Sequence, residues 1–106
     1  MCPICMTQKV MKGKWKLPII WLLKDNTLRF SEIQKSIPNV TQTYLSKQLK
    51  SLENDQLVIR KSYNQIPPKV EYSLSATGKD FIKVLDYMNV WGISYIQKYI
   101  MPLREE

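Results

Sequence analysis

The chain of 106 residues has a net charge of +7, with 16 Lys and Arg residues against 9 Asp and Glu residues, and 44% of it is hydrophobic. This length predicts one domain with an ordinary globular core. No apolar run approaches the roughly 20 residues of a membrane span. The absence of histidine and of a Gly-rich phosphate loop argues against an enzyme.

The basic character of the chain indicates what it binds. An excess of Lys and Arg favours a polyanionic partner, either a nucleic acid or an anionic membrane surface. The N-terminus lacks the basic, apolar and small-residue segments of a signal peptide. Two cysteines are too few for a disulfide scaffold. We therefore expect a cytoplasmic protein.

The first third of the chain predicts two short helices and a strand. A helix over residues 3–11 is followed by the apolar segment Trp15–Leu23, which predicts a buried helix. Pro18 fits that helix only within its first turn, where its missing amide is not needed. After a turn at Asp25–Asn26, the segment Leu28–Phe30 predicts a short strand.

Two amphipathic helices separated by a tight break come next. The first spans Ser31–Ile37 with Ser31 as its expected N-cap, and the break falls at Pro38–Asn39. The second runs from about Thr41 to Asn54, and Thr41 is expected to cap it. Two helices joined by so short a turn are typical of a helix-turn-helix, which places its second helix in the DNA major groove.

The second of these helices has a core side and a polar side. Leu45, Leu49 and Leu52 recur at helical intervals, which places them on one side. No acidic residue lies between Thr41 and Lys50, so the other side would approach DNA phosphates without repulsion. That side is expected to carry Gln42, Thr43, Ser46, Lys47 and Lys50.

A β-hairpin is predicted directly after these helices. Leu57–Tyr63 and Val70–Leu74 have the composition of strands, and Asn64–Lys69, with two prolines, forms the tip. Helix-turn-helix and hairpin together predict a winged helix-turn-helix, an α+β fold that is mainly helical. Residues 1–106 would form one domain, with the helix-turn-helix at about 31–54, the wing at about 57–74 and a last helix at about 75–100.

The last helix is expected to begin after a cap at Ser75 or Thr77 and to end before Pro102. Its apolar residues cover more than one face, whereas a surface helix needs one apolar stripe. A second subunit would bury the additional face, because a chain of this length has a modest core of its own. The alternative is a helix buried more deeply in its own domain. The expected dimer contacts are Phe81, Leu85, Met88, Trp91 and Tyr95.

The candidate DNA contacts divide into base-reading and phosphate-binding side chains. Gln pairs with adenine, Lys reaches guanine acceptors, and a Thr methyl contacts a thymine methyl. The predicted base readers are Gln42, Thr43, Ser46 and Lys47. The predicted phosphate contacts are Ser31, Lys35 and Lys50 from the helices and Lys61 and Lys69 from the wing, while Arg60 could instead point inward.

Five short segments form a combination that is more specific than any one of them. They are Cys2-Pro3, Gly13-Lys14-Trp15, Leu28-Arg29-Phe30, the wing segment Pro67–Tyr72, and Leu74-Ser75 followed by Gly78. Together they resemble the HxlR-type family of bacterial winged-helix regulators. The resemblance implies a homodimer joined through its terminal helices that binds double-stranded DNA at a pseudo-palindromic operator, in many members as a repressor. Tyr44 stands at a position that varies in the family and leaves the base preference open.

Cys2 and Cys5 are the one chemically suggestive pair. A structural zinc site is disfavoured, because it needs four ligands and the chain has no histidine. The resemblance implies a thiol sensor, since some HxlR-type proteins sense electrophiles or oxidants through a cysteine at the place of Cys2. Nearby lysines, at positions 9, 12 and 14, would favour the reactive thiolate. Cys5 would be a resolving or a packed thiol, and the alternative for Cys2 is a free thiol with no signalling role.

The main alternative function is a winged-helix adaptor that binds other proteins without reading DNA. An adaptor need not keep the segment Thr41–Lys50 basic and free of acids, as this chain does. No cofactor, metal ion or membrane partner is expected, and the residues identify no effector. We therefore predict a sequence-specific DNA-binding transcriptional regulator that acts as a homodimer.

Overall fold

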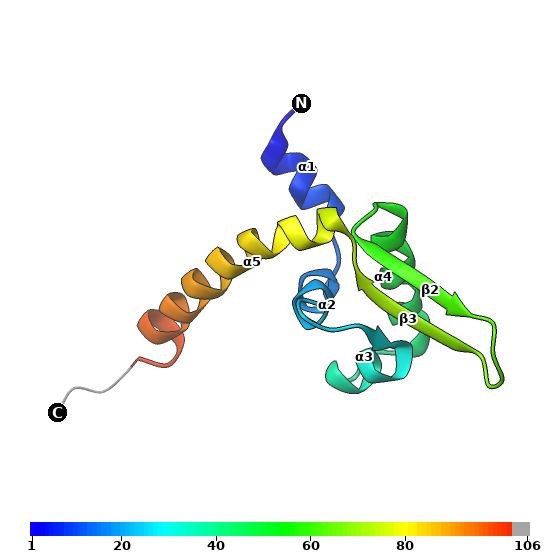
Figure 1. Ribbon diagram of the computed structural model, residues 1–106. Helices are drawn as coiled ribbons and strands as arrows, with labels where there is room; N and C mark the ends of the chain where they lie inside the picture. Colours follow the sequence, from blue (N-terminus) through cyan, green and yellow to red (C-terminus); the bar gives the residue numbers. More distant parts are fainter. Residues whose placement is uncertain (103–106) are drawn as a thin grey trace.

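A computed structural model of the protein describes residues 1–102, and residues 103–106 of the predicted domain lie outside the described part. Helices pack around a three-stranded antiparallel sheet of order β1-β3-β2 (Figure 1). The predicted winged helix-turn-helix is confirmed. In chain order the elements are α1 (Pro3–Val10), α2 (Lys16–Leu22), β1 (Leu28–Arg29), α3 (Phe30–Ser36), α4 (Gln42–Asn54), β2 (Val58–Tyr63), β3 (Lys69–Leu74), α5 (Ala76–Tyr95) and the π-helical turn η1 (Ile96–Ile100).

Side-chain caps explain where two of the helices begin. Thr41 Oγ1 accepts a hydrogen bond of 3.1 Å from the Tyr44 amide, which confirms Thr41 as the cap of α4. Ser75 Oγ accepts a bond of 3.0 Å from the Gly78 amide and is the cap of α5. Each hydroxyl satisfies one of the amides that the first turn of a helix leaves without a partner.

The predicted cap of α3 is wrong. This helix begins at Phe30 with Arg29 in the cap position, so Ser31 lies inside its first turn. The Glu32 carboxylate reaches back and accepts a hydrogen bond of 2.9 Å from the Arg29 amide. An acidic side chain near the helix N-terminus also complements the helix dipole. The strand before the helix fixes the position of Arg29, which moves the start of α3 toward the N-terminus.

The core forms where α4 meets the other helices and the sheet. Leu45, Leu49 and Leu52 are at most 1% exposed, as the leucine spacing predicted. They belong to one apolar cluster with Ile19 and Ile20 of α2. Burial of a leucine or isoleucine side chain stabilises a fold by about 1.5–3 kcal/mol. This apolar contact sets which side of α4 faces outward. Ile33 and Ile37 after β1, and Leu57, Val58, Tyr72 and Leu74 of the hairpin region, complete the core.

The register of the sheet separates an apolar face from a charged face. Val58 pairs with Leu74, and Leu28 of β1 pairs with Tyr72, so these four buried or half-buried residues of the three strands point to the same side. The alternate positions point to the opposite side. They include Arg29, Lys61, Tyr63, Lys69 and Glu71.

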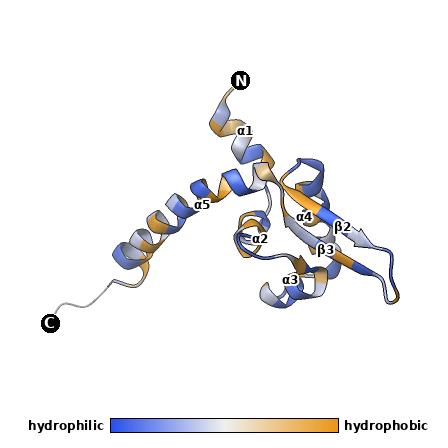
Figure 2. Ribbon diagram, in the orientation of Figure 1, coloured by the Kyte–Doolittle hydropathy of each residue, from blue (hydrophilic) through white to orange (hydrophobic). Residues whose placement is uncertain are grey.

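The terminal helices α1 and α5 extend away from this core (Figure 1). None of the residues of α1 is buried. In α5, Gly78 and Leu85 are buried, whereas hydrophobic positions continue along the part that projects from the body (Figure 2). Among residues 1–102, no helix is long and apolar enough to cross a membrane.

Gly78 provides a test of this packing, because a Cβ at its position would collide with the Leu57 backbone carbonyl. We expect Gly78→Ala to destabilise the protein by about 1–3 kcal/mol, although alanine is the better helix former. Thermal unfolding at fixed protein concentration measures the effect. Gly92→Ala in the same helix is the matched control, since a Cβ there meets nothing within 4 Å. Equal melting temperatures for the two variants would contradict the close approach of α5 and Leu57.

Candidate nucleic-acid interface

The outward side of α4 carries the polar residues that the sequence predicted. The buried leucine stripe turns these residues toward solvent, and the Thr41 cap fixes the point at which they begin. No carboxylate belongs to this side before Glu53. The exposed residues are Gln42, Thr43, Ser46, Lys47 and Lys50.

Tyr44 does not belong to this exposed side. Its side chain is half-buried, and its hydroxyl accepts a hydrogen bond of 3.2 Å from the Lys14 amide in the segment between α1 and α2. The tyrosine therefore holds α4 against the body of the protein. Sequence spacing placed Tyr44 early in the recognition helix, but it could not show that the ring points away from the groove side.

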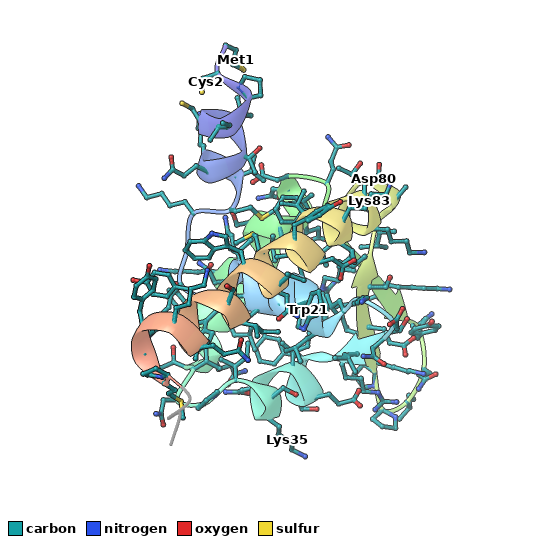
Figure 3. The ribbon with its side chains drawn as sticks, turned by 90° about the vertical axis from the view of Figure 1, so that its left-hand side faces the viewer. Met1, Cys2, Trp21, Lys35, Asp80 and Lys83 are labelled. Carbon is teal, nitrogen blue, oxygen red and sulfur yellow. The ribbon has the colours of Figure 1, made fainter. Side chains whose placement is uncertain are left out.

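The first helix of the helix-turn-helix adds two exposed candidates, Ser31 and Lys35. Lys35 extends outward from α3, at the end of the molecule opposite Cys2 (Figure 3). A helix that precedes the recognition helix commonly crosses the DNA backbone, where such side chains meet phosphates.

The outer face of the wing has a charged cluster around Tyr63. The Lys61 Nζ lies 5.0 Å from the centre of the Tyr63 ring, and the Lys69 Nζ lies 4.9 Å from it. The same ring therefore attracts two ammonium groups through its π electrons. Lys69 also lies 3.7 Å from a carboxylate oxygen of Glu71. Sequence analysis predicted the two lysines but missed Tyr63 and Glu71, which the register places on the same face.

Glu71 is the one acidic residue between Leu57 and Leu74. The Tyr63 hydroxyl, with further help from Lys69 and Arg29, holds the pKa of the Glu71 carboxyl below its ordinary value. The carboxylate is therefore charged at neutral pH. Its stabilisation of the wing is fully present above the ordinary pKa of about 4.3 and is lost as the pH falls through the lowered pKa.

Arg60 is exposed, although it pairs in register with the buried Tyr72 on the core side of the sheet. The tip of the hairpin extends beyond the helices (Figure 1), and the side chain of Arg60 reaches solvent although it belongs to the core side of β2. Arg60 thus lies on the inward face of the sheet, as the sequence suggested, but its side chain is not buried.

A family model describing HxlR-like helix-turn-helix proteins matches residues 10–100. The chain belongs to this family. YtcD of Bacillus subtilis, an HTH-type transcriptional regulator, is 42% identical over 92 residues, which cover 87% of this chain and 73% of YtcD. A crystal structure of ytcD has a TM-score of 0.88 at 41% identity and covers 92% of this chain and 100% of that chain.

Two further structural relatives of this HxlR-like protein are redox or transcriptional regulators. The redox regulator HypR in its oxidised form has a TM-score of 0.82 at 41% identity, over 88% of this chain and 96% of that chain. The reduced form of the transcriptional regulator YodB from Bacillus subtilis has a TM-score of 0.77 at 30% identity, over 98% and 99% of the two chains. The HxlR-like protein is a DNA-binding transcriptional regulator, as predicted, and its named relatives are transcriptional or redox regulators.

The two cysteines of the HxlR-like protein lie at the free end of α1 (Figure 3). Cys2 caps this helix, and its Sγ accepts a hydrogen bond of 3.1 Å from the Cys5 amide. Hydrogen bonds from the Cys5 side chain and amide lower the pKa of the Cys2 thiol, whereas the same thiol pair raises the pKa of Cys5. Cys2 therefore forms the thiolate, the reactive form, more readily than Cys5.

The predicted dimer contacts on α5 have different surroundings. Trp91 and Tyr95 are exposed, and their rings stack with centroids 5.2 Å apart. Met88 is also exposed, and with the half-buried Phe81 it lines an apolar groove of about 810 Å³ against α1. Leu85 is only 6% exposed and belongs to the core of its own chain, so little of its surface is left for the predicted contact with a partner.

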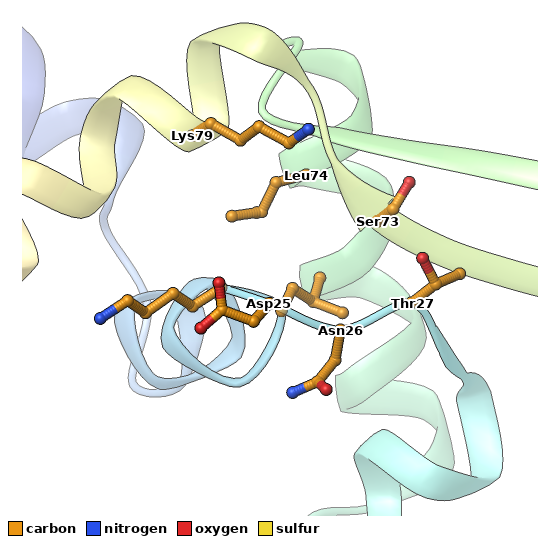
Figure 4. A pocket seen from close by; sticks show the side chains of 8 residues that line it. Asp25, Asn26, Thr27, Ser73, Leu74 and Lys79 are labelled. Atoms are coloured by element: carbon orange, nitrogen blue, oxygen red, sulfur yellow. The ribbon is translucent and has the colours of Figure 1, made fainter.

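A polar cavity of about 510 Å³ lies apart from the DNA candidates. It is bounded by the turn after α2, the end of β3 and the start of α5, with Lys79 and Asp25 on opposite sides (Figure 4). None of the predicted DNA contacts lines it. Nor do residues 1–102 contain a group of three or more His, Cys, Asp or Glu side chains placed to hold a metal ion.

Glu71 leads to a test of the wing. We expect Glu71→Gln to tighten DNA binding, because it removes a negative charge and frees Lys69 for a phosphate. One additional phosphate contact would steepen the plot of log affinity against log salt by about 0.9. Fluorescence anisotropy with a labelled duplex over a range of salt concentrations measures this slope. The matched control is Asp80→Asn, which makes the same charge change at an exposed position on α5 (Figure 3). If both variants changed the DNA affinity and its salt slope equally, the wing would not contact DNA.

Proposed function

We propose that this HxlR-like protein is a cytoplasmic, sequence-specific repressor that binds a pseudo-palindromic operator as a homodimer. The observation that carries the proposal is the outward side of α4, which is exposed, basic and free of carboxylates from Thr41 to Lys50. Buried leucines on the opposite side keep this surface turned outward. In this proposal residues 1–106 form one DNA-binding domain.

Base reading is assigned to the front of α4 and phosphate binding to its surroundings. Base-edge contacts give sequence preference, whereas phosphate contacts give affinity and register. The proposed base readers are Gln42, Thr43, Ser46 and Lys47, which begin at the Thr41 cap. The proposed phosphate contacts are Ser31, Lys35, Lys50, Lys61 and Lys69, and all but the half-buried Lys69 are exposed.

The exposed apolar side of α5 supports a second copy of the chain as partner. Trp91, Tyr95 and Tyr99 form a continuous series of neighbouring rings along one side of the helix, with centroids 5.2 and 5.1 Å apart. Trp91 is 68% exposed and Tyr99 is 72% exposed, which is unfavourable for such large aromatic side chains in water. Two subunits related by a two-fold axis would present their α4 helices to half-sites about 34–36 Å apart.

The sensor in this proposal is Cys2. Its lowered pKa supports attack by the thiolate on a hydroperoxide, which yields a sulfenic acid on Cys2 and releases the reduced alcohol or water. The Cys5 thiol is one helical turn away, and its condensation with the sulfenic acid would form a disulfide and release water. The redox regulator HypR, a structural relative, supports this assignment.

The recognition surface is tested with two lysine variants and a duplex that the parent protein selects from a random-sequence pool. We expect Lys47→Ala to weaken binding to the selected duplex about tenfold, through loss of a base contact. Lys50→Ala should weaken binding to the selected duplex and to a shuffled duplex alike, and should reduce the salt slope by about 0.9. Anisotropy titrations measure both effects.

The matched control for this experiment is Lys83→Ala, which removes one positive charge from an exposed position on α5 (Figure 3). Circular dichroism establishes that each variant keeps its fold. If both α4 variants bound like Lys83→Ala, the groove assignment would be wrong. Equal binding of the parent to every duplex in the pool would instead favour the adaptor function.

The sensor is tested by adding hydrogen peroxide to the same titration. We expect the affinity of the parent for the selected duplex to fall by about tenfold, a typical coupling between two sites. Cys2→Ser should not respond to peroxide. Cys5→Ser should still form the sulfenic acid, because it retains the attacking thiol of Cys2 and a hydroxyl donor beside it, but it cannot form the disulfide. Because the pKa of Cys2 is lowered, its reaction is expected to extend to lower pH than that of an ordinary thiol and to slow as the pH falls through that pKa. A response of Cys2→Ser equal to that of the parent would exclude Cys2 as the sensor.

A further inference from the structure

Lys16 has an unusual environment for a lysine. Within residues 1–102 it is the one buried side chain that is polar or charged, with 5% of its surface exposed. No carboxylate of the described chain forms an ion pair with it. A buried ammonium group without a counter-ion is costly, so its remaining partners determine whether it is tolerated.

Those partners belong to two different helices. The Lys16 Nζ donates a hydrogen bond of 3.2 Å to the carbonyl oxygen of Val10, the last residue of α1. It donates a second bond of 2.7 Å to Ser51 Oγ on α4. The carbonyls at the end of a helix lack amide partners and carry its negative dipole end, so an ammonium group stabilises the end of α1. One side chain on α2 therefore connects the end of α1 to the recognition helix.

Two neighbouring contacts reinforce this connection. The Lys14 amide donates to the Tyr44 hydroxyl, and the Gln48 amide group packs directly against Gly13. Gly13 has a φ of 143°, and a Cβ there would collide with Gln48 Oε1, so glycine is required on both grounds. The segment between α1 and α2 therefore fits closely against one line of residues on α4.

That line on α4 lies beside the proposed DNA surface. Tyr44, Gln48 and Ser51 are spaced by four and three residues and therefore occupy one stripe of the helix. Lys47 is three residues from Tyr44 and four from Ser51, so it is their direct neighbour on the helix surface. A rotation of α4 that lengthens the bond between Lys16 and Ser51 would also move Lys47.

The helix α1 depends on the same contacts for its direction. None of its residues is fully buried, and only Val10, at its end, packs against the core. The end of α1 is therefore held by Val10, by the bond from Lys16 to the Val10 carbonyl, by the buried Met11 directly after it, and by the segment from Gly13 to Lys16. A change in the direction of α1 is therefore transmitted to this segment first.

We infer that Lys16 is a positioning residue that couples the direction of α1 to the rotational setting of α4, through its simultaneous bonds to Val10 and Ser51. The inference rests on the proposed function, because it assigns DNA reading to α4. The coupling gives any event at α1, including modification of Cys2 or contact with a second subunit, a direct route to Lys47. Lys16 itself makes no contact with DNA.

The test compares Lys16→Met with Lys12→Met on the selected and shuffled duplexes. Both variants lose one positive charge, but Lys12 is exposed and its side chain forms no hydrogen bond or ion pair with α4 among the described residues, whereas methionine at position 16 keeps the buried volume and loses both bonds. We expect Lys16→Met to bind the selected duplex about tenfold more weakly than Lys12→Met, the loss expected for one displaced base contact. Binding to the shuffled duplex should be equal. Equal affinity of both variants for the selected duplex would overturn the inference.

Ser51→Ala provides a second variant that keeps the ammonium group and its bond to Val10. Alanine favours a helix, so this variant is expected to fold even if Lys16→Met does not. We expect a loss of specific affinity in the same direction. Combining it with Lys16→Met should add no further loss, because Lys16→Met has already broken the bond to Ser51 that Ser51→Ala removes. An unchanged affinity in Ser51→Ala, or fully additive losses in the double variant, would show that the bond does not position α4.

Hydrogen exchange on the DNA-free protein separates this inference from the proposed function. We expect Lys16→Met to accelerate exchange of the Met11 amide, which bonds to Thr7 in α1, and of the Lys14 amide, which bonds to Tyr44 on α4. The Lys79 amide at the start of α5 is the internal control. Faster exchange at both positions supports the coupling, whether or not the parent selects a duplex. Failure of the parent to select a duplex would contradict only the proposed function. Faster exchange at one position alone would contradict the coupling.

Discussion

The burial of three leucines along α4 is the contact on which the rest of this structure depends. Leu45, Leu49 and Leu52 are almost completely removed from water, and no other orientation of the helix would bury all three at once. Because a helix has a fixed geometry, burying this stripe also decides which residues are exposed on the other side. The basic surface proposed to read DNA is thus a consequence of core packing. The polar residues supply the hydrogen-bonding and charged groups of this surface, and the buried leucines decide that it faces solvent.

The wing obtains its basic surface in a different way. Here the alternation of a strand, and not a helical stripe, collects the charged residues on one face. Tyr63 and Glu71 hold the two wing lysines close to the sheet, through π electrons in one case and an ion pair in the other. These contacts restrict the motion of long side chains before DNA arrives, which reduces the entropy that binding must overcome. The carboxylate of Glu71 at the same time reduces the net charge of the wing.

The terminal helices show that the core of one chain leaves apolar surface uncovered. The rings of Trp91, Tyr95 and Tyr99 continue beyond the body, and the described residues 1–102 leave all three exposed. At the other end of the chain, α1 presents Cys2 far from α3 (Figure 3) and is attached through polar contacts around Lys16. The proposed function places sensing at Cys2 and DNA reading on α4, and it therefore needs a connection between the two. The buried ammonium group provides one, because its two bonds cannot both persist if the helices move independently.

The sequence by itself determined the order of the elements, the leucine stripe, the Thr41 cap and the exposed polar residues of α4. These features depend on the period of a helix and on hydrogen bonds within a few residues, so local spacing is sufficient to predict them. The tertiary structure decided the rest. It moved the cap of α3 from Ser31 to Arg29, turned Tyr44 inward, assigned Leu85 to the core, and brought Glu71 and Tyr63 beside Lys69. It also brought Lys16 next to Ser51, 35 positions away. Such contacts depend on how helices and strands pack across the chain, and no periodic pattern along the sequence contains that information.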